Sequence, residues 1–166
     1  MRDSYFGPPR AASARQYDEA GRALSPTQCV GDAAAGFNTT ARDMGTLLLE
    51  YGRARRGQSS ILTRAWLDTL ARPLVPVVMV VDGKPLAMGD SRMALGHFVH
   101  DGRNGRHMLF HSGGNPGVVA YLLVDLERDG GIFIAVNSDV ANSAAVVAAV
   151  LAAWGVRNRV DPPTLF

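Results

Sequence analysis

The chain is poor in cysteine, in lysine and in long apolar runs. Cys29 is the single cysteine among 166 residues, so no disulfide can form within the chain. An unpaired, inert thiol is expected there. No apolar run reaches the roughly 20 residues of a membrane-spanning helix, and the first residues carry no apolar signal-peptide core. These absences argue against a disulfide scaffold and a membrane span, and they leave the compartment undetermined.

The charge pattern gives little reason to expect a nucleic-acid partner. Seventeen basic and 15 acidic residues leave a net charge of +2, and every basic residue except Lys84 is an arginine. The arginines are scattered, and no helix carries a basic stripe. Residues 53–56 are locally basic, a pattern more typical of a solvated helix end than of a phosphate site.

Length and composition indicate one domain of the α/β (α+β) class, an antiparallel sheet flanked by helices. The hydrophobic fraction is 47% and the charged fraction 19%, values ordinary for a globular domain. The single domain is expected to span 1–166, with a loop-rich first segment over 1–35, helices over 40–72 and antiparallel strands over 77–137. A last helix is expected over 141–155, ended by Gly155 as a C-cap glycine.

The first helix has a capping signal. Thr40 can cap it while Asp43, three residues on, returns the hydrogen bond. One face of the helix then carries Met44, Leu47, Leu48 and Tyr51. We interpret Thr40 and Asp43 as a capping box over a packed helix, not as a catalytic pair. Thr63 is expected to cap the second helix.

Short turns separate the predicted strands. A small hairpin is expected around the Asp82-Gly83 turn. A strand is expected over 93–99, a turn over 101–105, and a turn at 129–131. Successive strands joined by such turns predict an antiparallel meander.

The most informative stretch is residues 111–117, His-Ser-Gly-Gly-Asn-Pro-Gly. Apolar runs over 108–110 and 118–124 flank it, which places His111 and Ser112 at a strand end. The two glycines let a substrate approach the backbone and leave N–H groups free to donate, as an acyl-transfer site requires. The alternative is a plain β-turn with a half-buried histidine.

This stretch, the apolar strand after it and residues 131–138 resemble the C-terminal part of the serine β-lactamase and penicillin-binding-protein-like hydrolases. Class C-related esterases and peptidases form the most similar branch. Residues 1–6 resemble the family's internal Gly-Met-x-Asp-Thr/Ser-x-Phe segment, and 33–44 its Ala-Gly-Gly-Leu-x-Ser-Thr-x-x-Asp-Leu segment. Residues 93–99 resemble its Tyr-Gly-Leu-Gly-Trp strand. The resemblance runs from Met1 to about Trp154, and it implies that Met1 is an internal methionine of a longer protein.

The resemblance also implies roles for the residues of this stretch. His111 matches the histidine of the family's His-x-Gly triplet, and Gly114 matches the residue whose N–H completes the oxyanion hole. Ser112, Gly113 and Asn115 are expected to line the substrate cleft. No cofactor is implied, and the substrate is expected to be an ester, an amide or a β-lactam.

Two of the family's catalytic motifs are absent. Lys84 has Val81 three positions before it, so there is no Ser-x-x-Lys, and no tyrosine begins a Tyr-x-Asn. We therefore expect the C-terminal segment of a hydrolase that is inactive alone. The alternatives are a noncatalytic binding or assembly module, and one half of a split hydrolase whose second chain carries the N-terminal half.

A zinc site is a further alternative, because all four histidines lie between 97 and 111. His97, His100, His107 and His111 offer imidazole ligands. In strands, however, residues at odd separation point to opposite faces, and His107 with His111 supplies only two ligands. We therefore predict no metal site.

Overall fold

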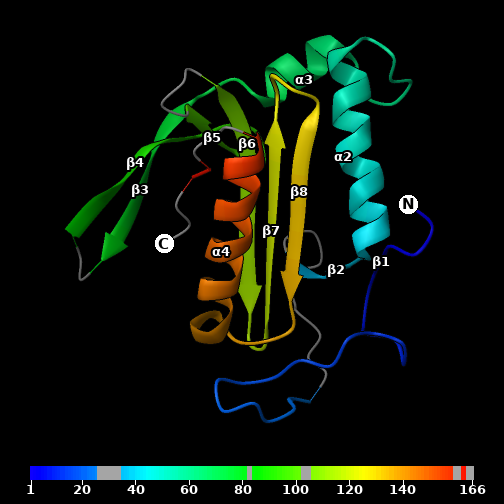
Figure 1. Cartoon of the computed structure of the whole chain (residues 1–166), viewed down its shortest axis with the longest axis vertical. Helices are drawn as coiled ribbons and strands as arrows, with labels where there is room; N and C mark the ends of the chain where they lie inside the picture. The colour runs from blue at the N-terminus through cyan, green and yellow to red at the C-terminus, as the bar shows by residue number, and fades with distance from the viewer. Residues whose placement is uncertain (26–34, 82–83, 102–105, 159–161, 164–166) are drawn as a thin grey trace.

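The computed structural model describes residues 1–25, 35–81, 84–101, 106–158 and 162–163, and its centre is a six-stranded antiparallel sheet (Figure 1). The strands lie in chain order: β3 (Val75–Val81), β4 (Lys84–Met93), β5 (Phe98–Asp101), β6 (His107–Asn115), β7 (Val118–Asp125) and β8 (Gly130–Val136). The helices are α2 (Ala41–Arg55), α3 (Arg64–Leu70) and α4 (Val140–Asn158), and β1 (Tyr5–Phe6) pairs with β2 (Phe37–Asn38). The predicted fold class, an antiparallel sheet flanked by helices, is confirmed.

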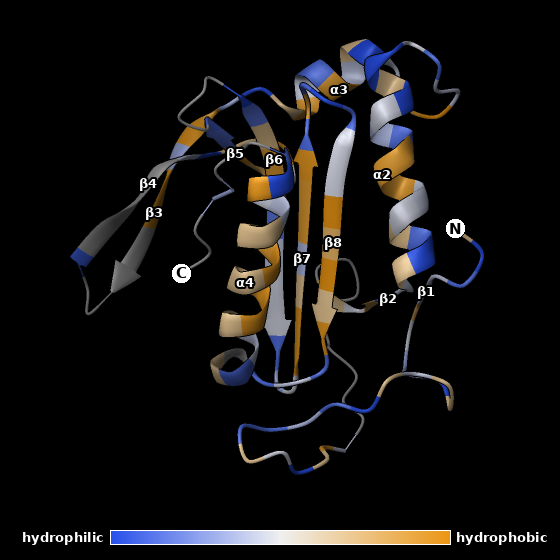
Figure 2. Cartoon of the chain, viewed as in Figure 1, coloured by the Kyte–Doolittle hydropathy of each residue, from blue (hydrophilic) through white to orange (hydrophobic). Residues whose placement is uncertain are grey.

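The sheet buries both faces because its central strands are apolar on both sides. Side chains alternate along β6, so Leu109 packs with the α2 and α3 side while Met108 and Phe110 pack with α4. Leu122 and Val124 of β7 join Leu109. Figure 2 shows the apolar residues gathered on β7, β8 and the helices beside them.

Both predicted helix caps are present. Thr40 has an extended backbone, and its Oγ1 accepts from the Asp43 N–H at 3.1 Å. Thr63 accepts in the same way from the Trp66 N–H at 3.2 Å. The four apolar residues predicted for one face of α2 all belong to the core on that side of the sheet: Met44, Leu47, Leu48 and Tyr51.

The last helix does not end at Gly155, so that prediction was wrong. α4 continues to Asn158, and Gly155 is buried within it. Tertiary contacts hold the final turn: the guanidinium groups of Arg106 and Arg128 donate to the Asn158 carbonyl oxygen at 3.2 and 3.1 Å. These donors satisfy a carbonyl that the helix end would leave unpaired, so the helix continues past its glycine.

Two turns differ from the sequence expectation. Residues 94–97 form a turn rather than part of a strand over 93–99, closed by Ala94 N–H donating to the His97 carbonyl at 2.8 Å. Gly96 has φ 71°, a conformation that glycine adopts without strain. The later turn lies at 126–129, where Asp129 has φ 54°, and both glycines after it are in β8. Asp101, the first residue of the turn expected over 101–105, is the last residue of β5. The rest of that turn, the turn expected at 82–83 and Cys29 lie outside the described residues.

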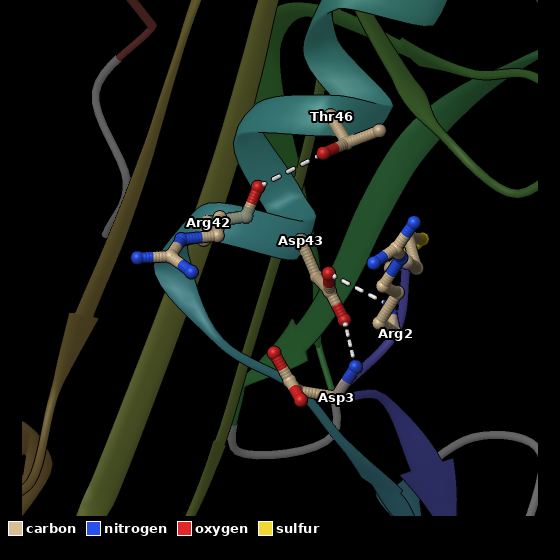
Figure 3. Close-up of a pocket in the computed structure, with 6 residues that line it drawn as sticks. Arg2, Asp3, Arg42, Asp43 and Thr46 are labelled. Atoms are coloured by element: carbon tan, nitrogen blue, oxygen red, sulfur yellow. Dashed lines mark hydrogen bonds between the residues drawn. The ribbon is translucent and has the colours of Figure 1, made fainter.

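Asp43 does not complete the predicted capping box. Asp43 is 4% exposed, and its carboxylate accepts from the N–H groups of Arg2 and Asp3 at 3.0 and 2.9 Å (Figure 3). It also accepts from the Ser4 hydroxyl at 2.6 Å. The expected return bond to Thr40 is therefore replaced by bonds to a segment about 40 residues away. The first residues of the chain are thus held against the start of α2.

The described helices include none with the length and apolarity needed to cross a membrane.

Gly131 of β8 allows a close approach of Leu48 of α2, and Gly131→Ala tests this contact. A Cβ there would lie 2.6 Å from Leu48 Cδ2 and 2.7 Å from the Leu123 carbonyl oxygen. We expect the variant to lose about 1 to 3 kcal/mol of unfolding free energy, the usual cost of overpacking, in urea denaturation. Gly130→Ala is the matched control, since nothing lies within 4 Å of its Cβ. Equal stability of the two variants would contradict the close approach.

The Asp43 anchor predicts a pH-dependent N-terminal segment. The Ser4 hydroxyl, followed by the two backbone N–H groups, lowers the pKa of Asp43 against the opposing effect of burial. The anchor is then fully present above the ordinary pKa of about 3.9 and is lost as pH falls through the lowered value. The NMR amide shifts of Arg2 and Asp3 should follow this loss. Asp43→Asn should change the amide shifts of Arg2 and Asp3 already at pH 7, because an amide NH2 replaces one accepting oxygen. Asp68→Asn, at an exposed aspartate, should leave these two shifts unchanged.

Candidate functional site

Residues 111–115 lie inside β6, not in a turn. Each pairs with β7, from His111 opposite Leu122 to Asn115 opposite Val118. The plain-turn alternative is therefore wrong, and so is the expected strand end at His111. The chain reverses instead at Pro116 and Gly117, where Gly117 has the positive φ of 76° that the third position of a type II turn requires.

On its other side, this half of β6 has no strand beside it in the part of the chain that the structure describes. β5 pairs with β6 only from Asp101 opposite His107 to Phe98 opposite Phe110. Before Phe98 the chain leaves the sheet through the turn at 94–97. An open strand edge therefore runs from His111 to Asn115, which we call the β6 edge.

The hydrogen-bond register decides which backbone groups face the β6 edge. Leu126 N–H donates to the His107 carbonyl at 3.2 Å, so alternate residues of β6 from His107 on exchange hydrogen bonds with β7. The groups between them, those of Ser112 and Gly114, point the opposite way. The Gly114 N–H is thus directed at the open side of the strand.

The side chains alternate as well. His111 is exposed. Its backbone pairs with Leu122, a residue of the α2 and α3 side, whereas its ring centroid lies 5.7 Å from that of Phe98, which packs with the α4 side. Ser112 is half-buried opposite Tyr121 and projects to the α4 side. Gly113 and Gly114 are exposed, and Asn115 is half-buried before the turn. The structure brings the five residues onto one strand segment.

The N-terminal segment packs against the turn that follows β6 and against the residues after β8. A Cβ on Gly117 would lie 2.8 Å from Gln16 Cβ and 2.9 Å from the Tyr17 backbone nitrogen, so only glycine fits this contact. Asn137 and Asn142 donate to the carbonyl oxygens of Arg15 and Glu19, each at 2.9 Å. The sequence showed no signal for these contacts, because they join residues at least 100 positions apart.

Next to His111, the structure forms a pair that the sequence did not indicate. Tyr51 of α2 is 6% exposed, and its hydroxyl lies 2.8 Å from His97 Nε2. The other ring nitrogen of His97, Nδ1, lies 3.2 Å from the Leu95 carbonyl oxygen. Burial raises the pKa of the Tyr51 hydroxyl. Burial also lowers the pKa of His97, against the opposing effect of the hydrogen bond to the Leu95 carbonyl, and the positive charge of a protonated His111 lowers it further.

The four histidines do not form a shared site. His107 Nδ1 lies 2.6 Å from Asp101 Oδ1 at the far end of β5, and His97 is held by Tyr51. Among the described residues, no group of three or more His, Cys, Asp or Glu side chains is arranged to hold a metal ion.

A shallow cavity of about 380 Å³ at the start of α2 is separate from this edge (Figure 3). Its lining consists of Met1, Arg2, Asp3, Arg42, Asp43 and Thr46. None of residues 111–115 contributes to this cavity, and the Asp43 carboxylate in its lining already accepts hydrogen bonds from the N-terminal segment. We therefore place the candidate site at the β6 edge.

Comparison with known proteins agrees with this architecture. The chain is similar to the octameric penicillin-binding protein homologue from Pyrococcus abyssi, with a TM-score of 0.64 and 18% identity over 90% of this chain. It covers 34% of that protein, so it spans about a third of the length of that relative. At this identity the likeness shows the fold. No match is found among curated proteins.

The sequence itself identifies the family. The family model described as Beta-lactamase matches residues 1–154, so the match includes β6 and its open edge and ends within α4. The chain therefore belongs to the beta-lactamase family, as a serine β-lactamase and penicillin-binding-protein-like member.

Proposed function

We propose that this chain is the C-terminal segment of a β-lactamase-related serine hydrolase and supplies one wall of its active site. The observation that carries the proposal is the direction of the Gly114 N–H, which faces the open β6 edge. A backbone N–H in such a place can donate to the oxyanion of an acyl-transfer intermediate without reorganisation.

The reaction that this wall serves is acyl transfer followed by hydrolysis. A serine hydroxyl from outside this chain adds to the carbonyl of an ester, amide or β-lactam, and its proton passes to a base. The Gly114 N–H donates to the resulting oxyanion. The leaving group departs with a proton, and water then releases the acid and restores the serine.

His111 is the side chain of the wall that contacts the substrate's polar groups. It is exposed on the strand segment that forms the β6 edge, so it can reach a substrate lying along that edge. Gly113 and Asn115 border the same edge, and Ser112 offers its backbone groups there. The half-buried Ser112 side chain projects to the α4 side of the sheet, so it is not the attacking nucleophile.

Alone, the chain is expected to be hydrolytically silent, because Lys84, its single lysine, stands in β4 without a serine three residues before it. A fluorophosphonate and a penicillin should each leave the intact mass unchanged. Covalent labelling that disappears in a serine variant would contradict the proposal.

The oxyanion role is tested in the completed protein. Translating the coding DNA upstream of the Met1 codon in the same frame identifies the missing half, expected to contain Ser-x-x-Lys and Tyr-x-Asn. In the joined chain, Gly114→Pro removes the N–H but no bond to β7, and kcat should fall by about 10² to 10³. Gly114→Ala keeps the N–H and should retain most activity. Equal losses in the two variants would argue against this donor.

A second candidate is a noncatalytic assembly module or one half of a split hydrolase. β8 ends the sheet, and the outer face of α4 leaves Val146, Val150 and Val156 exposed at 49%, 37% and 82%. Such surfaces favour association with another chain, and the similar Pyrococcus abyssi protein is octameric. Activity that appears only when the separately purified halves are mixed would favour the split hydrolase, and a complex without activity would favour the assembly module.

A further inference from the structure

The Tyr51–His97 pair lies beside the β6 edge and has no place in the reaction described above. Its two residues come from α2 and from the turn between β4 and β5, 46 positions apart. The rings meet edge to face, with centroids 5.8 Å apart. The inference drawn from this pair rests on the proposed function, because it concerns the electrostatics of the same wall.

Hydrogen-bond chemistry fixes the tautomer of His97. The Leu95 carbonyl oxygen can only accept, so the Nδ1 of His97 carries a hydrogen. In the neutral ring Nε2 then has a free lone pair, and the Tyr51 hydroxyl donates to it at 2.8 Å. Both nitrogens are satisfied in this state.

The protonated ring would fit this environment poorly. It would place a second hydrogen on Nε2, and the Tyr51 hydroxyl would have to turn its own hydrogen toward the core. Tyr51 is 6% exposed, so that hydrogen would lose its partner away from water. Burial already lowers the pKa of His97 and raises that of Tyr51, and both effects favour the neutral pair.

His97 and His111 are neighbours across the sheet. Phe98 and Phe110 are the last paired residues of β5 and β6, and His97 and His111 are the next residues beyond that pair. The groups acting on His97 are the Leu95 carbonyl, the Tyr51 hydroxyl from α2 and the charge of His111 from β6. A neutral His97 therefore spares His111 a like charge beside it.

We propose that Tyr51 locks His97 as the neutral Nδ1–H tautomer and that His97 is thereby a positioning residue for His111. His97 then adds no positive charge beside His111, the ring that borders the open edge.

NMR of the histidine rings in the chain as it stands tests this without enzymatic activity. Long-range ¹H–¹⁵N spectra should show the Nδ1–H tautomer for His97, and its titration midpoint should lie below the ordinary value of about 6.5. Tyr51→Phe should raise that midpoint by about 0.5 to 1 pH unit, since it removes the donor that favours the neutral ring. His111→Gln should also raise it, because the neighbouring charge is gone.

Tyr121→Phe is the matched control. It removes a buried hydroxyl, 1% exposed, on the α4 side of the sheet, and it should leave the His97 midpoint unchanged. An Nε2–H tautomer in the wild-type chain, or a midpoint that Tyr51→Phe does not move, would overturn the proposal. The tautomer of His97 is measured in the wild-type chain, so this measurement tests the proposal even if Tyr51→Phe fails to fold. If the joined chain is inactive although His97 is the neutral Nδ1–H tautomer, that result would refute only the proposed function.

Discussion

The pairing of β6 with β7 is the interaction on which the rest of the structure depends. Eight residue pairs run without interruption from Met108 opposite Asp125 to Asn115 opposite Val118. This register assigns one set of side chains to the α2 face and the other to the α4 face, and it also turns the Gly114 N–H outward. A slip by one residue would exchange both faces at once, so the core and the candidate site are specified by the same hydrogen bonds.

Much of the fold could be predicted from local patterns. The caps at Thr40 and Thr63 and the apolar spacing along α2 are short-range signals, and the structure retains them. The errors came where distant contacts outweigh local preference. Gly155 is a good helix terminator in isolation, but Arg106 and Arg128 bind the carbonyl of Asn158 beyond it. Asp43 likewise has the sequence position of half of a capping box, but its carboxylate accepts hydrogen bonds from the backbone N–H groups of Arg2 and Asp3 at the start of the chain.

The candidate site divides in the same way. Its residues could be located from the motif at 111–115, because glycine pairs and a histidine between apolar runs are visible in one short stretch. The direction of the Gly114 N–H could not be predicted from the sequence. It depends on where β5 ends and on which residues of β6 form hydrogen bonds with β7. Nor could the partnership of Tyr51 with His97: helical spacing assigned Tyr51 to the core, and His97 was considered only as a metal ligand. Their contact exists because α2 crosses the face of the sheet beside the turn at 94–97.

The composition of the β6 edge bears on the solubility of the protein. Exposed strand edges recruit further strands most readily when they are long, flat and rich in β-branched residues. This edge is five residues long, contains two adjacent glycines and has no β-branched side chain. Glycine weakens strand association because it loses the most backbone entropy on pairing and offers no side chain for a neighbour to pack against. The edge is therefore a poor template for fibril growth, while its backbone groups remain accessible to a small molecule.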